Sequence, residues 1–180
     1  MKSAISILLL TLTTALASGP FGEWKVIQGS FIRPNDATPY ASGDLTANST
    51  TAGSVVPVPL VIGNATETQF EVSRIRISKT STGISGATFR IHLFSVSPTV
   101  TSGDNAAIVI ATGAAGYLGQ WDVAAMQSFT DGATGFIITG ANKLVLLGAG
   151  TIYALLECRG AYTPTALETF TVTLEGTVNR

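Results

Sequence analysis

The chain has 180 residues, of which 46% are hydrophobic and only 12% are charged, and its formal net charge is −1. Soluble proteins carry about 25% charged residues on average, so Thr, Ser, Asn and Gly must cover most of this surface. Such a surface suits either a protein packed against other subunits or a secreted β-domain. The scattered Lys and Arg residues exclude bulk electrostatic binding of nucleic acid.

The N-terminal segment, MKSAISILLLTLTTALASG, contains an apolar stretch from Ala4 to Ala17. Its lysine, its short apolar run and its Ala15-Leu16-Ala17 sequence are typical of a secretory signal peptide. The stretch is too short and too rich in threonine to be a convincing membrane span. The competing interpretation is a retained arm that docks on a neighbouring subunit.

A long polar loop is predicted over residues 33–51, after a strand over residues 24–32. Pro34 and Pro39 remove backbone donors. The residues that favour turns are Asn35, Asp36, Gly43 and Asp44. A loop of this length in one domain is usually functional or an interface. Asp36, Asp44 and, in a later loop, Asp104 could bind a hard cation such as calcium. Their spacing matches no EF-hand, and turn capping is the favoured role.

The stretch from Gln69 to Ser95 predicts two strands joined by a turn-rich connection, which we interpret as a central hairpin. In the first strand the parity of the apolar residues changes between Val72 and Ile75. Because a one-residue slip turns every side chain to the other face, we expect a β-bulge near Ser73–Arg74.

The remaining segments also have the character of short strands. Pro57 and Pro59 confine residues 55–62 to an edge strand or a bulged strand. Residues 144–147 and 152–159 predict a hairpin, and residues 169–175 alternate apolar and polar side chains as a closing strand. Many short strands separated by Gly and Pro turns predict an all-β fold, an antiparallel β-sandwich that is jelly-roll-like.

A search for chemistry in the sequence finds no catalytic, cofactor or metal motif. His92 is the only histidine, so a His–His or His–Cys metal pair within one chain is excluded, and no nucleophile elbow accompanies it. We expect His92 to be a solvated or interface residue. Cys158, the only cysteine, is expected to be a small buried hydrophobe. The sequence therefore predicts that the protein is not an enzyme.

Several turn and strand segments between Ile32 and Val178 carry a family resemblance. They are Arg33-Pro34-Asn35-Asp36, Tyr40, Ser42-Gly43-Asp44, Ser102-Gly103-Asp104-Asn105, Gly116-Tyr117-Leu118-Gly119, Asp131-Gly132, Tyr153–Glu157 and Thr169–Glu175. In these segments the chain resembles the capsid decoration, or cement, proteins of tailed bacteriophages. Members of that family are jelly rolls on the outside of the head, often dimers or trimers, that tie neighbouring capsomers together.

The resemblance implies a structural virion protein that binds the major capsid protein, uses no cofactor, and has no nucleic-acid or membrane partner. It would assemble in the host cytoplasm and reside on the capsid surface, with residues 1–22 as a retained arm and residues 23–180 as one sandwich domain. The candidate interface residues are Ile7, Leu8, Leu9 and Leu10 in the arm, and Arg33, Asp36, Tyr40 and Asp44 in the loop.

Two other functional classes stay open. A secreted carbohydrate-binding or adhesive β-sandwich would be cleaved after Ala17 and would use scattered aromatic residues to stack on sugars. A hydrolase with a carboxylate pair would require two of the eleven Asp and Glu residues to face each other at a fixed distance.

Overall fold

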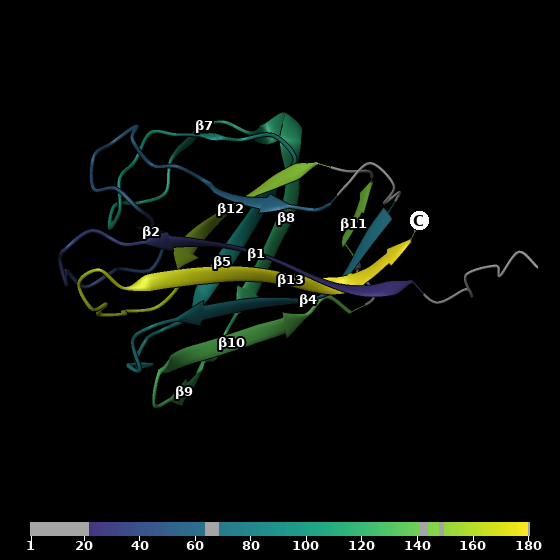
Figure 1. Cartoon of the computed structure of the whole chain (residues 1–180). Helices are drawn as coiled ribbons and strands as arrows, with labels where there is room; N and C mark the ends of the chain where they lie inside the picture. Colours follow the sequence, from purple (N-terminus) through teal and green to yellow (C-terminus); the bar gives the residue numbers. More distant parts are fainter. Residues whose placement is uncertain (1–21, 64–68, 141–143, 148–149, 180) are drawn as a thin grey trace, which may run out of the picture.

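The protein is a sandwich of two antiparallel sheets, seen in a computed structural model that describes residues 22–63, 69–140, 144–147 and 150–179 (Figure 1). The six-stranded sheet contains β1 (Glu23–Ile32), β13 (Thr169–Asn179), β4 (Gln69–Lys79), β10 (Gly132–Ile138), β9 (Gln127–Phe129) and β11 (Leu144–Leu147). The five-stranded sheet contains β2 (Leu45–Thr46), β12 (Thr151–Cys158), β5 (Phe89–Phe94), β8 (Tyr117–Val123) and β3 (Val58–Val61). The predicted sandwich is confirmed, whereas the predicted arm lies, apart from Gly22, outside the described residues.

The chain crosses between the sheets several times, and this corrects two predicted hairpins. β4 belongs to the six-stranded sheet and β5 to the five-stranded sheet, because the two sides of β4 are already occupied by β13 and by β10 with β11. In the same way β11 pairs with β4, whereas β12 pairs with β5. The two strands of each predicted hairpin therefore lie in opposite sheets, on either side of the core, instead of pairing with each other.

The β-bulge expected from the parity change in β4 is confirmed. Strand β13 pairs Glu175 with Arg74 and then Gly176 with Val72, so Ser73 is the extra residue. As a result Phe70, Val72, Ile75 and Ile77 are all buried. The arginines of β4 fall on the opposite side of the sheet.

The core fills the space between the two sheets. Phe89 of β5 makes edge-on contacts with Phe170 of β13 and with Tyr162, at ring-centroid distances of 5.4 and 5.6 Å. Phe31 of β1 stacks on Phe170 at 5.6 Å. Each such buried aromatic contributes roughly 1.5–3 kcal/mol of hydrophobic free energy. Cys158 is also fully buried here, as its strand pattern predicted.

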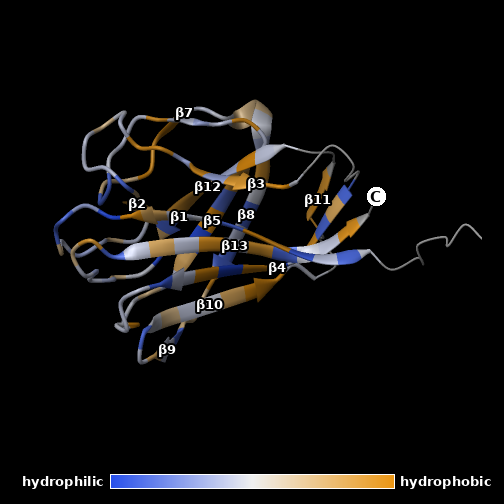
Figure 2. Ribbon diagram, in the orientation of Figure 1, coloured by the Kyte–Doolittle hydropathy of each residue, from blue (hydrophilic) through white to orange (hydrophobic). Residues whose placement is uncertain are grey.

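The two outer faces of the sandwich differ. The five-stranded sheet is partly covered by the ribbon of β6 (Thr99–Val100) and β7 (Ile110–Thr112), which lies near the 3-10 turn Ala114–Gly116. Under that cover Phe94, Val100 and Leu155 form part of a second hydrophobic cluster. The six-stranded sheet also has hydrophobic segments in β10 and β11 (Figure 2), and some of its large hydrophobic side chains are exposed on the outward side. No described segment forms a second hydrophobic cluster on that side. That face therefore holds the candidate site.

Candidate interaction face

Large hydrophobic side chains are exposed on the outward side of the six-stranded sheet. They alternate along their strands with core residues, so they point away from the core. Trp24 and Phe136 are each 55% exposed, and Ile138 is 66% exposed. We call this surface the outer sheet face and define it by Trp24, Val26, Glu71, Arg74, Arg76, Phe136, Ile138, Val145 and Glu175.

Strand register arranges the outer sheet face in rows that run across four strands. The rows are Trp24–Thr177–Glu71–Val145, then Val26–Glu175–Arg74–Ile138, then Gln28–Thr173–Arg76–Phe136. The hydrophobic residues thus lie on the flanking strands, and the charged residues lie on the central strands β13 and β4. With strands about 4.8 Å apart, the two apolar flanks are roughly 14 Å apart.

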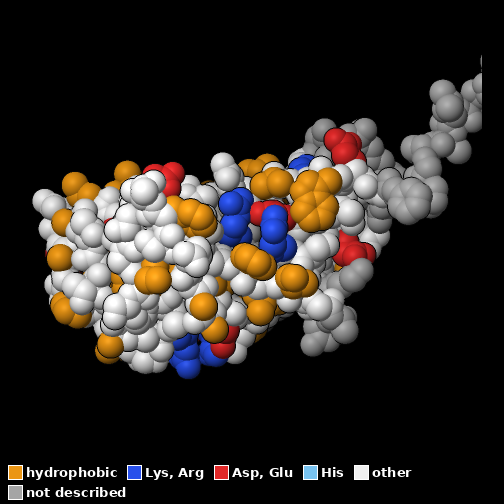
Figure 3. Space-filling view, turned by 90° about the horizontal axis from the view of Figure 1, so that it is seen from below, with side chains coloured by type: hydrophobic (Ala, Val, Ile, Leu, Met, Phe, Trp, Pro, Cys, Tyr) orange, Lys and Arg blue, Asp and Glu red, His pale blue; other side chains and the backbone are white. Residues whose placement is uncertain are grey.

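A charged cluster occupies the centre of this face. The Glu175 side chain is only 3% exposed, and its Oε2 accepts hydrogen bonds from Nε of Arg74 at 2.8 Å and from Nη2 of the same residue. Nε of Arg76 lies 3.0 Å from Oε1 of Glu175 but makes no hydrogen bond there, because its N–H is poorly aligned. The Arg74 guanidinium also lies 5.5 Å from the ring centre of Phe136. Figure 3 shows basic and acidic side chains gathered together with hydrophobic ones around them.

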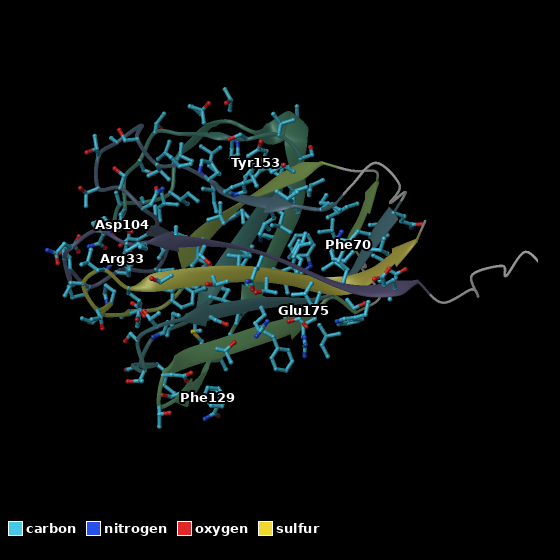
Figure 4. All side chains as sticks on the ribbon, viewed as in Figure 1. Arg33, Phe70, Asp104, Phe129, Tyr153 and Glu175 are labelled. Carbon is cyan, nitrogen blue, oxygen red and sulfur yellow. The ribbon has the colours of Figure 1, made fainter. Side chains whose placement is uncertain are left out.

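The predicted interface residues of the polar loop occupy a different place, at the end of the sandwich opposite the C-terminus (Figure 4). Arg33 and Tyr40 are buried, so their side chains offer no surface to another molecule in this conformation. Arg33 Nη2 donates to Asp104 Oδ2 at 2.7 Å, and the Tyr40 hydroxyl donates to Oδ1 at 2.6 Å. Burial, and the nearby Asp104 carboxylate, raise the pKa of Tyr40, which keeps its phenol protonated as a donor. These residues tie the loop to the segment around Asp104.

The other predicted interface residues divide into two groups. Asp36 and Asp44 lie in the loop with partly exposed side chains, and both cap turns: Asp36 accepts from the Thr38 amide at 3.2 Å, and Asp44 from the Ala41 amide at 2.6 Å. This is the capping role expected for loop aspartates. Ile7, Leu8, Leu9 and Leu10 lie outside the described residues.

His92 belongs to a network on the outward side of β5. It is 9% exposed, less than a solvated histidine would be, and its Nε2 lies 2.9 Å from Oε2 of Glu157. Arg159 donates to the other oxygen of Glu157 at 2.7 Å. Burial raises the pKa of Glu157, but the hydrogen bonds from His92 and Arg159 outweigh it and hold that pKa below its usual range. With these partners the network serves to hold β5 to β12.

Neither a metal centre nor a membrane-spanning helix is found in the described part of the chain. No group of three or more His, Cys, Asp and Glu residues there could hold a metal ion. Over the same ranges, no helix is long and apolar enough to span a membrane.

Sequence reasoning missed the outer sheet face. A signal was present in Phe136, Ile137 and Ile138, since three consecutive hydrophobic residues must place at least one on each side of a strand. In a sandwich one side of such a strand faces the core, so the other side must be exposed or covered by a partner.

Neither the protein-family models nor the curated proteins provide a relative of this chain. No protein-family model matches this chain, and no curated protein shows significant similarity to it. The fold and the outer sheet face define the class: an antiparallel β-sandwich with a partly apolar face that no described segment covers.

Proposed function

We propose that this protein is a non-enzymatic structural protein that binds the outer surface of a tailed-phage capsid and stabilises it by bridging capsid subunits. The outer sheet face is the observation that carries the proposal. Exposed apolar patches rimmed by polar residues mark interaction sites, and this face carries two such patches on either side of its charged cluster. The phage capsid is suggested by the resemblance to decoration proteins.

The composition of the face favours a protein partner. Aromatic residues and arginine are enriched at protein–protein interfaces, and they contribute most of the binding free energy where they are central. Here Trp24, Phe136 and two arginines occupy a surface held flat by paired strands. A rigid surface of this kind loses little conformational entropy on binding.

A repeating capsid would also explain how a modest surface gives durable attachment. Linked or oligomeric copies that engage several lattice sites gain affinity through effective concentration, without additional contacts. The low share of charged residues, 12%, fits a protein that is permanently packed against other subunits.

The proposal is tested with heads of the encoding phage prepared from a strain that lacks this gene. The purified full-length protein should sediment with these heads up to a fixed ratio, and it should raise the temperature at which they release DNA. Protein that stays in the supernatant at concentrations well above micromolar would contradict the proposal.

A secreted carbohydrate-binding domain is the second candidate function. The observation that favours it is the exposed ring of Trp24, since a flat aromatic surface can stack on a sugar. Retention on immobilised glycans, together with no binding to heads, would favour this alternative.

A further inference from the structure

We infer that the outer sheet face binds a protein surface that presents a carboxylate side chain between two apolar patches, with the carboxylate seated on Arg76. This inference rests on the proposed function and names the chemistry of the partner. It is carried by the juxtaposition of spare arginine donors with two hydrophobic flanks.

The centre of the outer sheet face has too few hydrogen-bond acceptors for its two arginines. Glu175 is shared by Arg74 and Arg76, so this triad has two positive charges and one negative charge. Among the described residues, neither Nη of Arg76 has a hydrogen-bond acceptor, and its Nε makes no hydrogen bond. Its side chain is 36% exposed, so these donors can be reached from solution. Glu71, which lies in the row of Trp24 and Val145, interacts with other groups.

Arg76 lies on β4, between the two apolar flanks of the outer sheet face. Its row places Phe136 directly beside it on β10, and the neighbouring row adds Ile138 on the same flank. Val26 and Trp24 form the opposite flank, on β1. A partner that covers both flanks would exclude water from the centre, where a charge-assisted hydrogen bond to a guanidinium becomes stronger.

The same arrangement favours a different protein over a second copy of this chain. A two-fold dimer whose axis passes through the triad would place Arg74 and Arg76 of one copy against the same residues of the other. Like charges brought together at an interface are costly, so a dimer centred on the triad is disfavoured. A carboxylate on a partner supplies the acceptor that the triad lacks.

Arg76 is the informative residue for a test. If Arg76→Gln is made, Glu175 keeps its hydrogen bonds from Arg74, so the sheet should fold normally. Arg90→Gln is the matched control, because Arg90 is an outward-facing arginine of the other sheet and is paired with Asp122.

The experiment measures dissociation constants of full-length variants for heads that lack this protein, at two salt concentrations. Arg76→Gln should weaken binding by about 30-fold or more and reduce its salt dependence, as loss of a desolvated charge pair does. Arg90→Gln should change the dissociation constant by less than about 3-fold, as exposed rim charges do. Trp24→Thr and Phe136→Thr, which leave Glu175 and its arginines in place, should each weaken binding by about 10-fold or more.

The outcomes separate the two proposals. Failure of the wild-type protein to bind heads would overturn both. Wild-type binding that all three face variants retain at full strength would overturn only the assignment of this face. A dimer of the free protein in sedimentation that Phe136→Thr dissociates would also overturn the inferred partner, because the face would then be occupied by a second copy.

Discussion

At the scale of single residues, the buried ion pair between Arg33 and Asp104 fixes the long loop. The two residues are 71 positions apart, and both side chains are fully buried. The sequence predicted turn capping for the loop aspartates, and Asp36 and Asp44 do cap turns, because capping depends only on neighbouring residues. For Asp104 the same prediction is wrong, since its buried carboxylate accepts hydrogen bonds from residues distant in sequence. The sequence did not predict the pairing of Arg33 with Asp104, because no local pattern encodes a contact over that separation.

Replacing Asp104 should destabilise the protein strongly. Asp104→Ala removes the buried carboxylate on Arg33 and leaves its guanidinium, among the described carboxylates, only the longer, 3.4 Å contact with Asp36 Oδ1. It also leaves the Tyr40 hydroxyl and the Ala47 amide without their acceptor. We expect a loss of about 3–5 kcal/mol in the free energy of unfolding, measured by urea denaturation.

The control for this substitution is Asp122→Ala. Asp122 also pairs with an arginine, but its side chain is 53% exposed, so the loss should be at most about 1 kcal/mol. Equal losses for the two variants would contradict a structural role for the buried pair.

At the scale of strands, the alternation of side chains predicted which face of a strand is buried. It did not predict which strands pair with each other. The bulge at Ser73 followed from the parity of apolar residues within β4. The separation of β4 and β5 into opposite sheets depends on which strands compete for the two sides of β4, and alternation along one strand carries no information about that competition. The role of Gly176, opposite the bulge, was also missed.

Gly176→Ala should therefore destabilise the six-stranded sheet. The bulge brings the backbone of β4 so close that a Cβ atom on Gly176 would lie 1.9 Å from the Glu71 carbonyl oxygen. Because that oxygen belongs to the backbone, the strands must separate, and we expect a loss of at least about 2 kcal/mol in thermal or urea unfolding.

Gly150→Ala is the matched substitution, since a Cβ atom there meets nothing within 4 Å. The free energy of unfolding of this variant should lie within about 1 kcal/mol of the wild-type value, because alanine restricts the unfolded chain and causes no clash with the described residues. A neutral Gly176→Ala would show that the backbone of the bulge relaxes more easily than the structure indicates.

At the scale of the whole molecule, the two outer faces of the sandwich differ in how far the described residues cover them. The five-stranded sheet is partly covered by the β6–β7 ribbon, whereas the six-stranded sheet leaves Trp24, Phe136 and Ile138 exposed around the Arg74–Glu175–Arg76 cluster. Composition predicted a poorly charged surface, suited either to contacts with other subunits or to a secreted β-domain. The location of the face required the register of four strands, which brings together residues from distant parts of the chain.

The most direct test of a capsid-binding role is an electron cryo-microscopy reconstruction of the intact phage head. We predict density for the sandwich on the outside of the head, with the outer sheet face turned toward the capsid and an acidic side chain of the major capsid protein against Arg76. A head without this density, or a sandwich whose outer sheet face points to solvent, would contradict the account.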